Sequence, residues 1–143
     1  MNFQLKTNPE IKLTSVTKND ALFLYNLLKE RESNINISHK KMPTYAQHMK
    51  FIESKPYSKW YIIKLSNKKI GSAYLSKQNE IGIFIIKNMH QQKLGTSVLN
   101  ILIKKNHRKR YLANINPKNK KSMGFFKKNG FKLVQYTFEL ERD

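Results

Sequence analysis

Three short apolar runs that follow one another closely place the strongest constraint on the fold of this chain. They span residues 59–65, 69–75 and 80–86, and only three or four residues separate each run from the next. Runs of this length, rich in Ile and aromatic residues, are typical of β-strands, and such short gaps suit hairpins. The sequence therefore predicts consecutive antiparallel strands in the middle of the chain.

Helical and strand-like segments alternate on either side of these runs. Apolar residues at helical spacing and capping residues predict helices over residues 21–31, 44–54, 94–105 and 119–128. Further strands are expected over residues 11–16, 111–115 and 131–140. No linker, repeat or low-complexity segment interrupts this order, so we expect residues 1–143 to form one domain.

Composition excludes several classes of protein. The chain has no cysteine, which rules out disulfides, thiolate catalysis and cysteine-ligated zinc, and we expect no metal. No apolar run approaches the roughly 18 to 20 residues of a membrane span, and residues 1–10 lack the apolar stretch of a secretory signal. We therefore expect a cytosolic protein without a membrane partner.

The chain is strongly basic. Lys and Arg number 28 against 9 Asp and Glu, which gives a formal net charge of +19. Such a charge attracts polyanions, whether nucleic acid, acidic lipid headgroups or a phosphorylated small molecule. The basic residues are spread along the chain, and a composition rich in Lys and Asn produces the same count on a merely solvated surface. Nucleic acid is therefore one candidate partner, but the charge alone does not distinguish it from the other anions.

A strand that leads through a polar loop into the most regular helix carries the first chemical signal. The segment is EIGIFIIKNMHQQKLGT, residues 80–96. The backbone N–H groups of such a loop and the helix dipole point toward the same place, where an anion binds. Gly95 permits close approach of the backbone. Alone, this pattern is common among α/β proteins.

The second half of the chain makes the signal specific. Residues 114–131, NINPKNKKSMGFFKKNGF, carry Asn119, Ser122, Phe126 and Gly130-Phe131 at the spacing of a signature of the GNAT family of acyl-CoA N-acyltransferases. The phosphate loop of that family matches residues 90–95. The chain resembles the family over essentially its whole length. The resemblance implies an α/β fold with a mixed, mostly antiparallel sheet of about six strands, splayed in the middle, with helices on both faces.

The resemblance also implies acetyl-CoA as co-substrate and assigns residues to it. Acetyl-CoA is expected between the strand that ends at Ile86 and the strand of residues 111–115. A backbone N–H at Phe84 or Ile85 would stabilise the oxyanion, Asn119 would bind the cofactor or cap its helix, and Phe126 would pack on the pantetheine arm. The pyrophosphate is expected on the loop of Gln91, Gln92, Lys93, Leu94, Gly95 and Thr96.

Three positions depart from the family pattern. His90 stands where the family has Gln or Arg, and Lys93 stands where it usually has the first Gly. A Lys beside a pyrophosphate supplies charge compensation, provided that its backbone angles suit a residue with a Cβ. Phe126 replaces the Tyr that commonly acts as general acid, and a phenylalanine has no proton to give.

Direct transfer to an amine needs a base, because only the neutral amine attacks the thioester. Glu80, which opens the last central strand, is the first candidate, and an edge carboxylate paired with a lysine is the alternative interpretation. His48 and His39 are further candidates, because imidazole titrates near neutral pH, with a structural role as the alternative. For the acid, the expectation is Tyr74, Tyr111 or Tyr136, unless the thiolate leaves unassisted.

The acceptor is indicated less directly. Residues 38–63 resemble a segment of the amino-sugar N-acetyltransferases of the pseudaminic acid pathway, with the matching residues Tyr45, His48, Phe51, Trp60 and Tyr61. This implies an anionic small-molecule amine, such as a nucleotide-linked amino sugar. Two alternatives stay open: an acetyltransferase for a protein or nucleic-acid amine, and a non-catalytic module of this fold that binds nucleic acid or acyl-CoA. A monomer and a homodimer are both compatible with the sequence.

Overall fold

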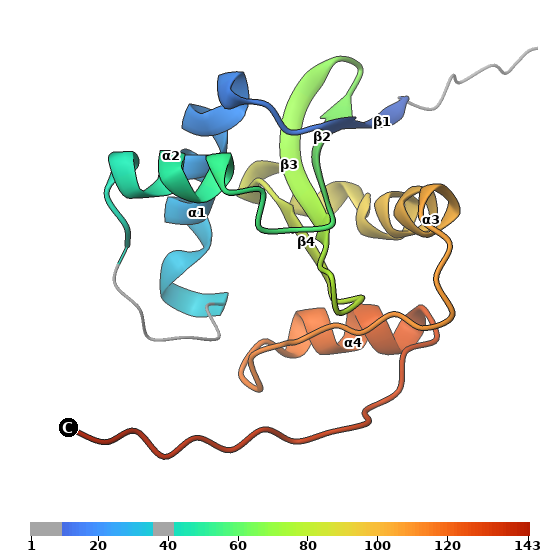
Figure 1. Ribbon diagram of the computed structural model, residues 1–143. Helices are drawn as coiled ribbons and strands as arrows, with labels where there is room; N and C mark the ends of the chain where they lie inside the picture. The colour runs from blue at the N-terminus through green and yellow to red at the C-terminus, as the bar shows by residue number, and fades with distance from the viewer. Residues whose placement is uncertain (1–9, 36–41) are drawn as a thin grey trace, which may run out of the picture.

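A four-stranded antiparallel sheet organises the fold. The structure, a computed structural model, describes residues 10–35 and 42–143 (Figure 1). The sheet has the order β1-β2-β3-β4, and its strands are Ile11–Ser15, Lys59–Leu65, Lys68–Leu75 and Ile81–Ile85. The predicted run of consecutive antiparallel strands is confirmed, because β2 pairs with β3 and β3 with β4. Ser66 and Asn67, at the β2–β3 turn, both have positive φ, as tight hairpin turns require.

Helices cover both faces of the sheet. Figure 1 shows α1, Ala21–Ile35, and α2, Tyr45–Glu53, on one side, with α3, Gly95–Lys105, on the other. The 3₁₀ helices η1, Lys18–Asp20, and η2, Lys87–Gln92, precede α1 and α3, and α4 spans Lys120–Lys128. None of the helices within residues 10–35 and 42–143 has the length and apolar character that a membrane crossing requires.

The alternation of side chains along the strands divides the apolar residues between the two faces. Ile62 points to the first face, where it packs with Leu24 of α1 and Ile52 of α2. Its neighbour Ile63 points to the second face. There the larger buried cluster includes Leu75 of β3 and Ile81 of β4, together with Val98, Leu99 and Leu102 of α3. The sheet is therefore packed against apolar side chains on both faces.

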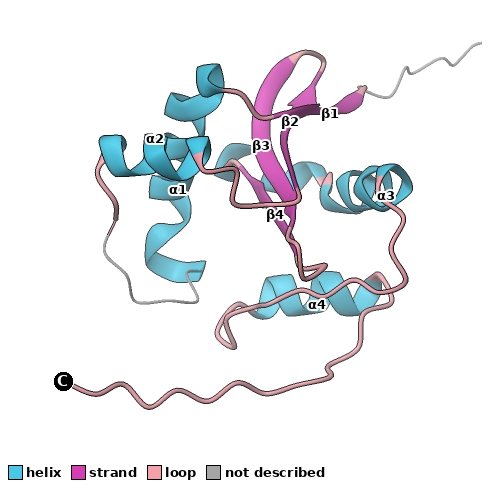
Figure 2. Ribbon diagram, viewed as in Figure 1, coloured by secondary structure: helices cyan, strands magenta, loops and turns pink. Residues whose placement is uncertain are grey.

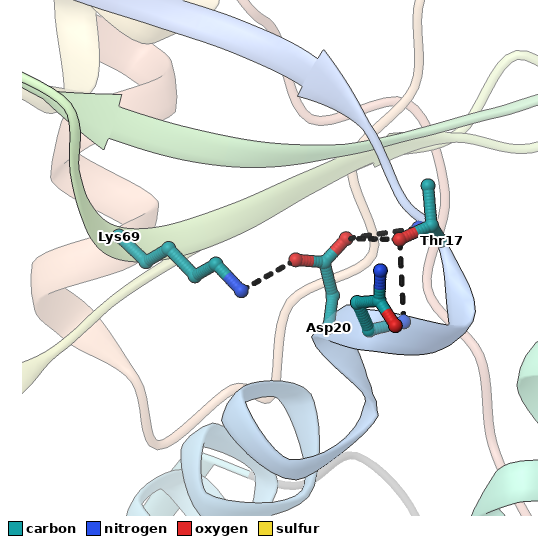
Figure 3. Close-up of polar contacts among 4 residues, drawn as sticks. Thr17, Asp20 and Lys69 are labelled. Atoms are coloured by element: carbon teal, nitrogen blue, oxygen red, sulfur yellow. Dashed lines mark hydrogen bonds and ion pairs between the residues drawn. The ribbon is translucent and has the colours of Figure 1, made fainter.

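A partly buried ion pair fixes the start of α1 against the sheet. Lys69 Nζ on β3 lies 2.7 Å from Asp20 Oδ1, and the backbone N–H of Thr17 donates to Asp20 Oδ2 at 2.8 Å (Figure 3). The Thr17 side chain accepts in turn from the N–H of Asn19 at 3.2 Å. The Asp20 carboxylate thus completes the capping box of η1 and also pairs with Lys69 of β3.

The second half of the chain joins this sheet by very little backbone pairing. Leu112 makes an isolated parallel bridge with Glu80, in which the Ile81 N–H donates to the Leu112 carbonyl at 2.7 Å. Residues 131–143, the C-terminal tail, are extended and are drawn as loop to the C-terminus in Figure 2. The segments predicted as strands over 111–115 and 131–140 therefore differ from expectation. One has a single bridge and the other has no neighbouring strand among the described residues.

Candidate functional site

A cavity of about 600 Å³ opens where the end of β4, the start of α3, the helix α4 and the second half of α1 meet. Its lining is rich in cationic side chains: Arg31, Lys87, Lys93, Lys121 and Lys128. Among the described residues that line it, Glu30 is the only acid, and its Oε1 accepts the Lys87 backbone N–H at 2.9 Å. The cavity is therefore electrostatically suited to an anion.

The N-terminus of α3 lies at this cavity without a side-chain cap. The N–H groups in the first turn of a helix have no partner within the helix. Lys93 precedes the helix in the left-handed conformation, with φ 56° and ψ 44°. Leu94, Gly95 and Thr96 follow along the cavity wall. Uncapped N–H groups, the helix dipole and the Lys93 ammonium group together favour a phosphate-like anion here.

The outer edge of β4 offers further unpaired backbone groups. The Ile86 N–H donates to the Ile70 carbonyl of β3, and the direction of the backbone groups alternates along a strand. The N–H of Phe84 therefore points to β3, whereas those of Ile83 and Ile85 point away from it, toward the cavity that both residues line. The Ile85 carbonyl lies 2.6 Å from Nε2 of His90. Of the two N–H groups expected to stabilise an oxyanion, only that of Ile85 faces the open edge.

The helix α4 forms the opposite wall and is fixed to α3 by close contacts. Asn119 caps α4 by accepting the Ser122 N–H at 3.1 Å, and Phe126 is buried behind it. A Cβ on Gly95 would lie 2.8 Å from the Phe125 ring, so the glycine is needed for this helix contact. Asn129 Nδ2 donates to Thr96 Oγ1 at 3.3 Å. These contacts place α4 beside the uncapped helix end.

Most residues predicted to bind the cofactor lie together at this cavity. Its lining includes Phe84, Ile85, Lys93, Leu94, Gly95, Thr96, Asn119 and Phe126. Ile86 is outside that lining, because its N–H is used by β3 and its side chain packs on the core. Gln91 and Gln92 end η2 immediately before Lys93, and their side chains lie outside the described part of the chain.

A row of aromatic rings leads from the cavity across the first face of the sheet. The rings of Tyr57 and Tyr74 stack with centroids 4.0 Å apart, and the Tyr74 ring lies 6.1 Å from that of Phe84. Tyr74 covers Gly82, where a Cβ would meet its ring at 2.2 Å. Within the described residues, neither phenol hydroxyl has a hydrogen-bond partner. The row therefore presents two unpaired phenols beside Phe84.

Burial keeps both phenols protonated. It raises the pKa of Tyr57 to about 12, an effect to which Tyr74 adds and which Arg31 partly offsets. Burial also raises the pKa of Tyr74, which the nearby Arg31 lowers and Glu80 raises further. Tyr74 thus lies within electrostatic reach of a cation and of the carboxylate predicted as the base. A neutral phenol at pH 7 has a proton to donate.

Glu80 lies at the start of β4, outside the cavity lining. Its Oε1 accepts the Ser76 hydroxyl at 3.1 Å, and its Oε2 accepts Nδ2 of Asn114 at 2.7 Å. The carboxylate therefore bridges the β3–β4 turn and the segment after the parallel bridge. The ion pairs found in the described chain do not include it, so the alternative of a lysine-paired edge carboxylate has no support in the structure.

Arg31 is a site residue for which sequence reasoning gave no signal. Its guanidinium carbon lies 3.6 Å above the centre of the Phe84 ring. Its Nε is buried without a hydrogen-bond partner in the described structure, and the residue lines the cavity. Burial lowers the pKa of this guanidinium, yet an Arg remains charged at neutral pH. Residues 29–33, KERES, are charged and stand near the end of a helix, a pattern typical of a solvated helix face. Phe84 comes to lie beneath Arg31 only in the folded chain.

The remaining predicted candidates lie apart from the cavity. His48 of α2 is only 5% exposed, its Nε2 has no partner among the described groups, and burial lowers its pKa. Its ring stacks on Phe51. The Tyr111 hydroxyl donates to the Asn106 carbonyl at 2.6 Å, and Tyr136 lies on the exposed tail. His39 falls outside the described residues.

Comparison with known proteins decides the family. Residues 22–131 match the model of the acetyltransferase (GNAT) family. The chain belongs to this family. Comparison with curated proteins gives no significant match. The segment matched includes the cavity and both motifs quoted for the GNAT resemblance, so the motifs and the geometry agree.

Solved structures share the GNAT fold with this chain. A domain from Methanocaldococcus jannaschii DSM 2661 is 23% identical with a TM-score of 0.79, over 92% of this chain and 94% of that one. RimL, a ribosomal L7/L12 alpha-N-protein acetyltransferase in complex with coenzyme A, is 14% identical with a TM-score of 0.68, over 92% and 84%. The spermidine/spermine N-acetyltransferase SpeG from Vibrio cholerae is 15% identical with a TM-score of 0.68, over 85% and 79%.

As a GNAT N-acetyltransferase the chain uses acetyl-CoA, and the cavity offers groups that fit it. The uncapped start of α3 and Lys93 suit the pyrophosphate, as the phosphate-loop motif predicted. The N–H groups of Ile83 and Ile85, which point away from β3 and have no partner within residues 10–35 and 42–143, suit the amide and thioester carbonyls of the pantetheine arm. When bound, acetyl-CoA would supply the activated acyl group, and the groups that line the cavity would orient it.

Proposed function

We propose that the chain transfers the acetyl group of acetyl-CoA directly to the primary amine of a small molecule that also carries an anionic group. A nucleotide-linked amino sugar is the first example, in keeping with the likeness of residues 38–63 to amino-sugar enzymes. One observation supports the anionic group of the acceptor: Arg31 lines the cavity, and its buried Nε has no hydrogen-bond partner among the described residues.

A buried guanidinium nitrogen without a partner costs free energy, which an anionic ligand recovers. Phe84 fixes the plane of the guanidinium from one face, which leaves its edge for a carboxylate or a phosphate. A polyamine would bring positive charge to a wall that already holds Arg31 and several lysines. The charge of the wall therefore favours an anionic amine over a polycation.

The proposal gives a role to each of the predicted side chains. Glu80 is assigned as the base that takes the ammonium proton, directly or through water, and the Ile85 N–H is assigned to the oxyanion. Tyr74 is assigned as the acid for the CoA thiolate, in place of the Tyr that Phe126 replaces. His48 is retained as an alternative base, since burial keeps its imidazole neutral.

An acceptor screen tests the proposal. Release of CoA is measured with matched amines that differ only in an anionic group, such as an amino sugar, its phosphate and its nucleotide derivative, beside spermidine and a peptide N-terminus. We expect the phosphorylated amines to have the highest kcat/KM. Preference for spermidine, for the peptide or for a nucleic-acid amine contradicts the proposal and selects a different acceptor class.

The Arg31→Met variant links that preference to the cavity. Loss of a charged hydrogen bond of about 1.5–3 kcal/mol should raise KM for the anionic amine about 10- to 100-fold and leave KM for acetyl-CoA nearly unchanged. Arg108→Met is the matched control, because Arg108 bonds Ser58 outside the cavity lining. The same loss with an uncharged amine would mean that Arg31 is only structural.

A further inference from the structure

His90, in the 3₁₀ helix η2, folds back onto the strand that η2 follows. Its Nε2 lies 2.6 Å from the carbonyl oxygen of Ile85, the last residue of β4. A carbonyl oxygen only accepts hydrogen bonds, so Nε2 carries a proton and donates it. The ring is exposed and also lines the cavity. His90 therefore links the segment before α3 to the end of β4.

This hydrogen bond fixes the second end of the peptide unit between Ile85 and Ile86. The N–H of that unit, on Ile86, donates to the Ile70 carbonyl of β3 at 2.8 Å. The carbonyl of the same unit, on Ile85, points the opposite way, because the two groups of a trans peptide are antiparallel. On that side it meets the His90 ring. The peptide unit cannot turn about the strand axis without losing a hydrogen bond.

The peptide unit on the other side of Ile85 is held by β3. Phe84 pairs with Ser72, and its carbonyl oxygen lies so close to β3 that a Cβ on Gly71 would overlap it. The Ile85 N–H belongs to this unit and points to the open edge of β4, beside the Ile85 carbonyl. The direction of the Ile85 N–H is therefore fixed by β3 on one side and by His90 on the other.

The same hydrogen bond changes the electrostatics of the open edge. The Ile85 carbonyl and the Ile85 N–H point the same way, so an uncovered carbonyl would place the negative end of a dipole beside a developing oxyanion. The His90 N–H covers that oxygen. The edge then presents the N–H groups of Ile83 and Ile85 to an acyl group, with the neighbouring carbonyl already bonded.

We propose that His90 is a positioning residue for acetyl transfer. Its Nε2–H, bonded to the Ile85 carbonyl, holds the Ile85 N–H toward the thioester oxygen and shields the oxyanion from that carbonyl. The inference rests on the proposed function for the role of the Ile85 N–H, and it is independent of which amine accepts the acetyl group. In this role His90 acts through Ile85, so its effect belongs to the rate of transfer and not to acetyl-CoA binding.

Two substitutions separate the hydrogen bond from the bulk of the side chain. His90→Leu keeps an apolar bulk and has no donor, whereas His90→Gln keeps a side-chain N–H. With the amine that the unmodified chain acetylates fastest, we expect kcat of His90→Leu to fall about 10- to 100-fold and kcat of His90→Gln to stay within about fivefold. KM for acetyl-CoA should change less than about threefold in both. His107→Leu is the matched control, because His107 is exposed outside the cavity lining.

The kinetic outcomes decide the role of the hydrogen bond. An unchanged kcat in His90→Leu overturns the proposal, and so does an equal loss in His90→Gln. A raised KM for acetyl-CoA with kcat intact overturns it as well, because His90 would then act on the cofactor phosphates. Since the fastest amine is used whatever its class, a preference for spermidine or for a peptide refutes the proposed acceptor and leaves this test intact.

The tautomer of the ring gives a readout that needs no turnover. In ¹⁵N NMR at about pH 9, where a histidine ring is neutral, we expect the single ring proton of His90 on Nε2. His90→Gln removes the signal and assigns it. A proton on Nδ1 overturns the proposal even in a chain that acetylates anionic amines as proposed, because Nε2 could not then donate to the Ile85 carbonyl.

Discussion

At the scale of single residues, Lys93 holds a backbone conformation that side chains with a Cβ seldom adopt. Its φ of 56° lies in the left-handed region, where the GNAT motif usually has glycine. For an L-residue this region costs roughly 1–2 kcal/mol. This backbone strain occurs where the chain turns into α3 at the cavity. It arises from the Cβ of a residue whose side chain is cationic. The strain and the charge are thus located at the same residue.

Two substitutions at this residue separate strain from charge. Lys93→Gly should relieve the backbone and raise the free energy of unfolding by about 0.5 kcal/mol, after allowance for the greater freedom of the unfolded chain. Lys93→Asn removes the charge but keeps a side chain that tolerates this conformation. We expect both to weaken acetyl-CoA binding several-fold in calorimetry, and only Gly to add stability in urea unfolding. Lys55→Gly, at φ 50°, is the control for backbone relief away from the cavity.

Asp20 governs a different property, the stability of the fold in acid. Burial raises the pKa of this carboxyl, but the hydrogen bond from Lys69, the Thr17 N–H and the Lys69 charge outweigh burial and hold it below its usual 3.8. The ionised form therefore stabilises the fold above the unfolded-state value. This contribution is lost as the pH falls through the depressed folded-state value.

Replacement of the carboxylate should expose that dependence. Asp20→Asn breaks a partly buried charged pair, and after allowance for solvent screening of Lys69 we expect it to lower the free energy of unfolding by about 1–2 kcal/mol at pH 7. The gap between the variant and the unmodified chain should narrow below about pH 4 in urea titrations. Glu10→Gln, which breaks the exposed pair with Lys12, should change stability little at any pH. A gap that is constant down to pH 2 would contradict the assignment.

At the scale of elements, local patterns predicted what local interactions determine. The helices and the strands β1 to β4 lie close to their predicted bounds, because capping residues and apolar periods act within a few residues. Residues 111–115 and 131–140 have the same strand character, yet strand structure also needs a neighbour on the pairing edge. The neighbouring strand would lie elsewhere in the chain and is not part of either local pattern. The sequence alone therefore did not predict that residues 111–115 would make a single bridge and that residues 131–140 would lack a neighbouring strand in the described structure.

The contact between α3 and α4 is the element-scale determinant of the cavity. A methyl group at Gly95 would meet the Phe125 ring, so Gly95→Ala should push α4 outward and separate the walls that acetyl-CoA spans. We expect about tenfold weaker acetyl-CoA binding with little change in overall stability. Gly124→Ala places its Cβ in open space within α4 and should stabilise the chain by about 0.5–1 kcal/mol. Unchanged affinity in Gly95→Ala would show that α4 adapts.

At the scale of the whole molecule, the candidate site combines residues that no single motif contains. The phosphate-loop motif located Lys93 to Thr96, and the later signature located Asn119 and Phe126. Arg31 and Tyr57 reach the same region only because α1 and the end of the α2–β2 connection pack on one face of the sheet. Sequence patterns therefore located those residues of the cavity that lie in two local segments, and missed Arg31, which only the packing of α1 brings to the cavity.

The isolated bridge between Glu80 and Leu112 affects how readily the second half of the chain opens locally. Residues 106–128 are joined to β4 by little backbone pairing, so their amide protons should exchange with deuterium sooner than those of β2 and β3. Acetyl-CoA between β4 and α4 would connect the two parts where the protein itself does not. We expect the ligand to slow exchange in residues 111–128 and to leave β2 and β3 unchanged. In this enzyme, bound acetyl-CoA would then stabilise the contact between β4 and α4, which few backbone hydrogen bonds hold together.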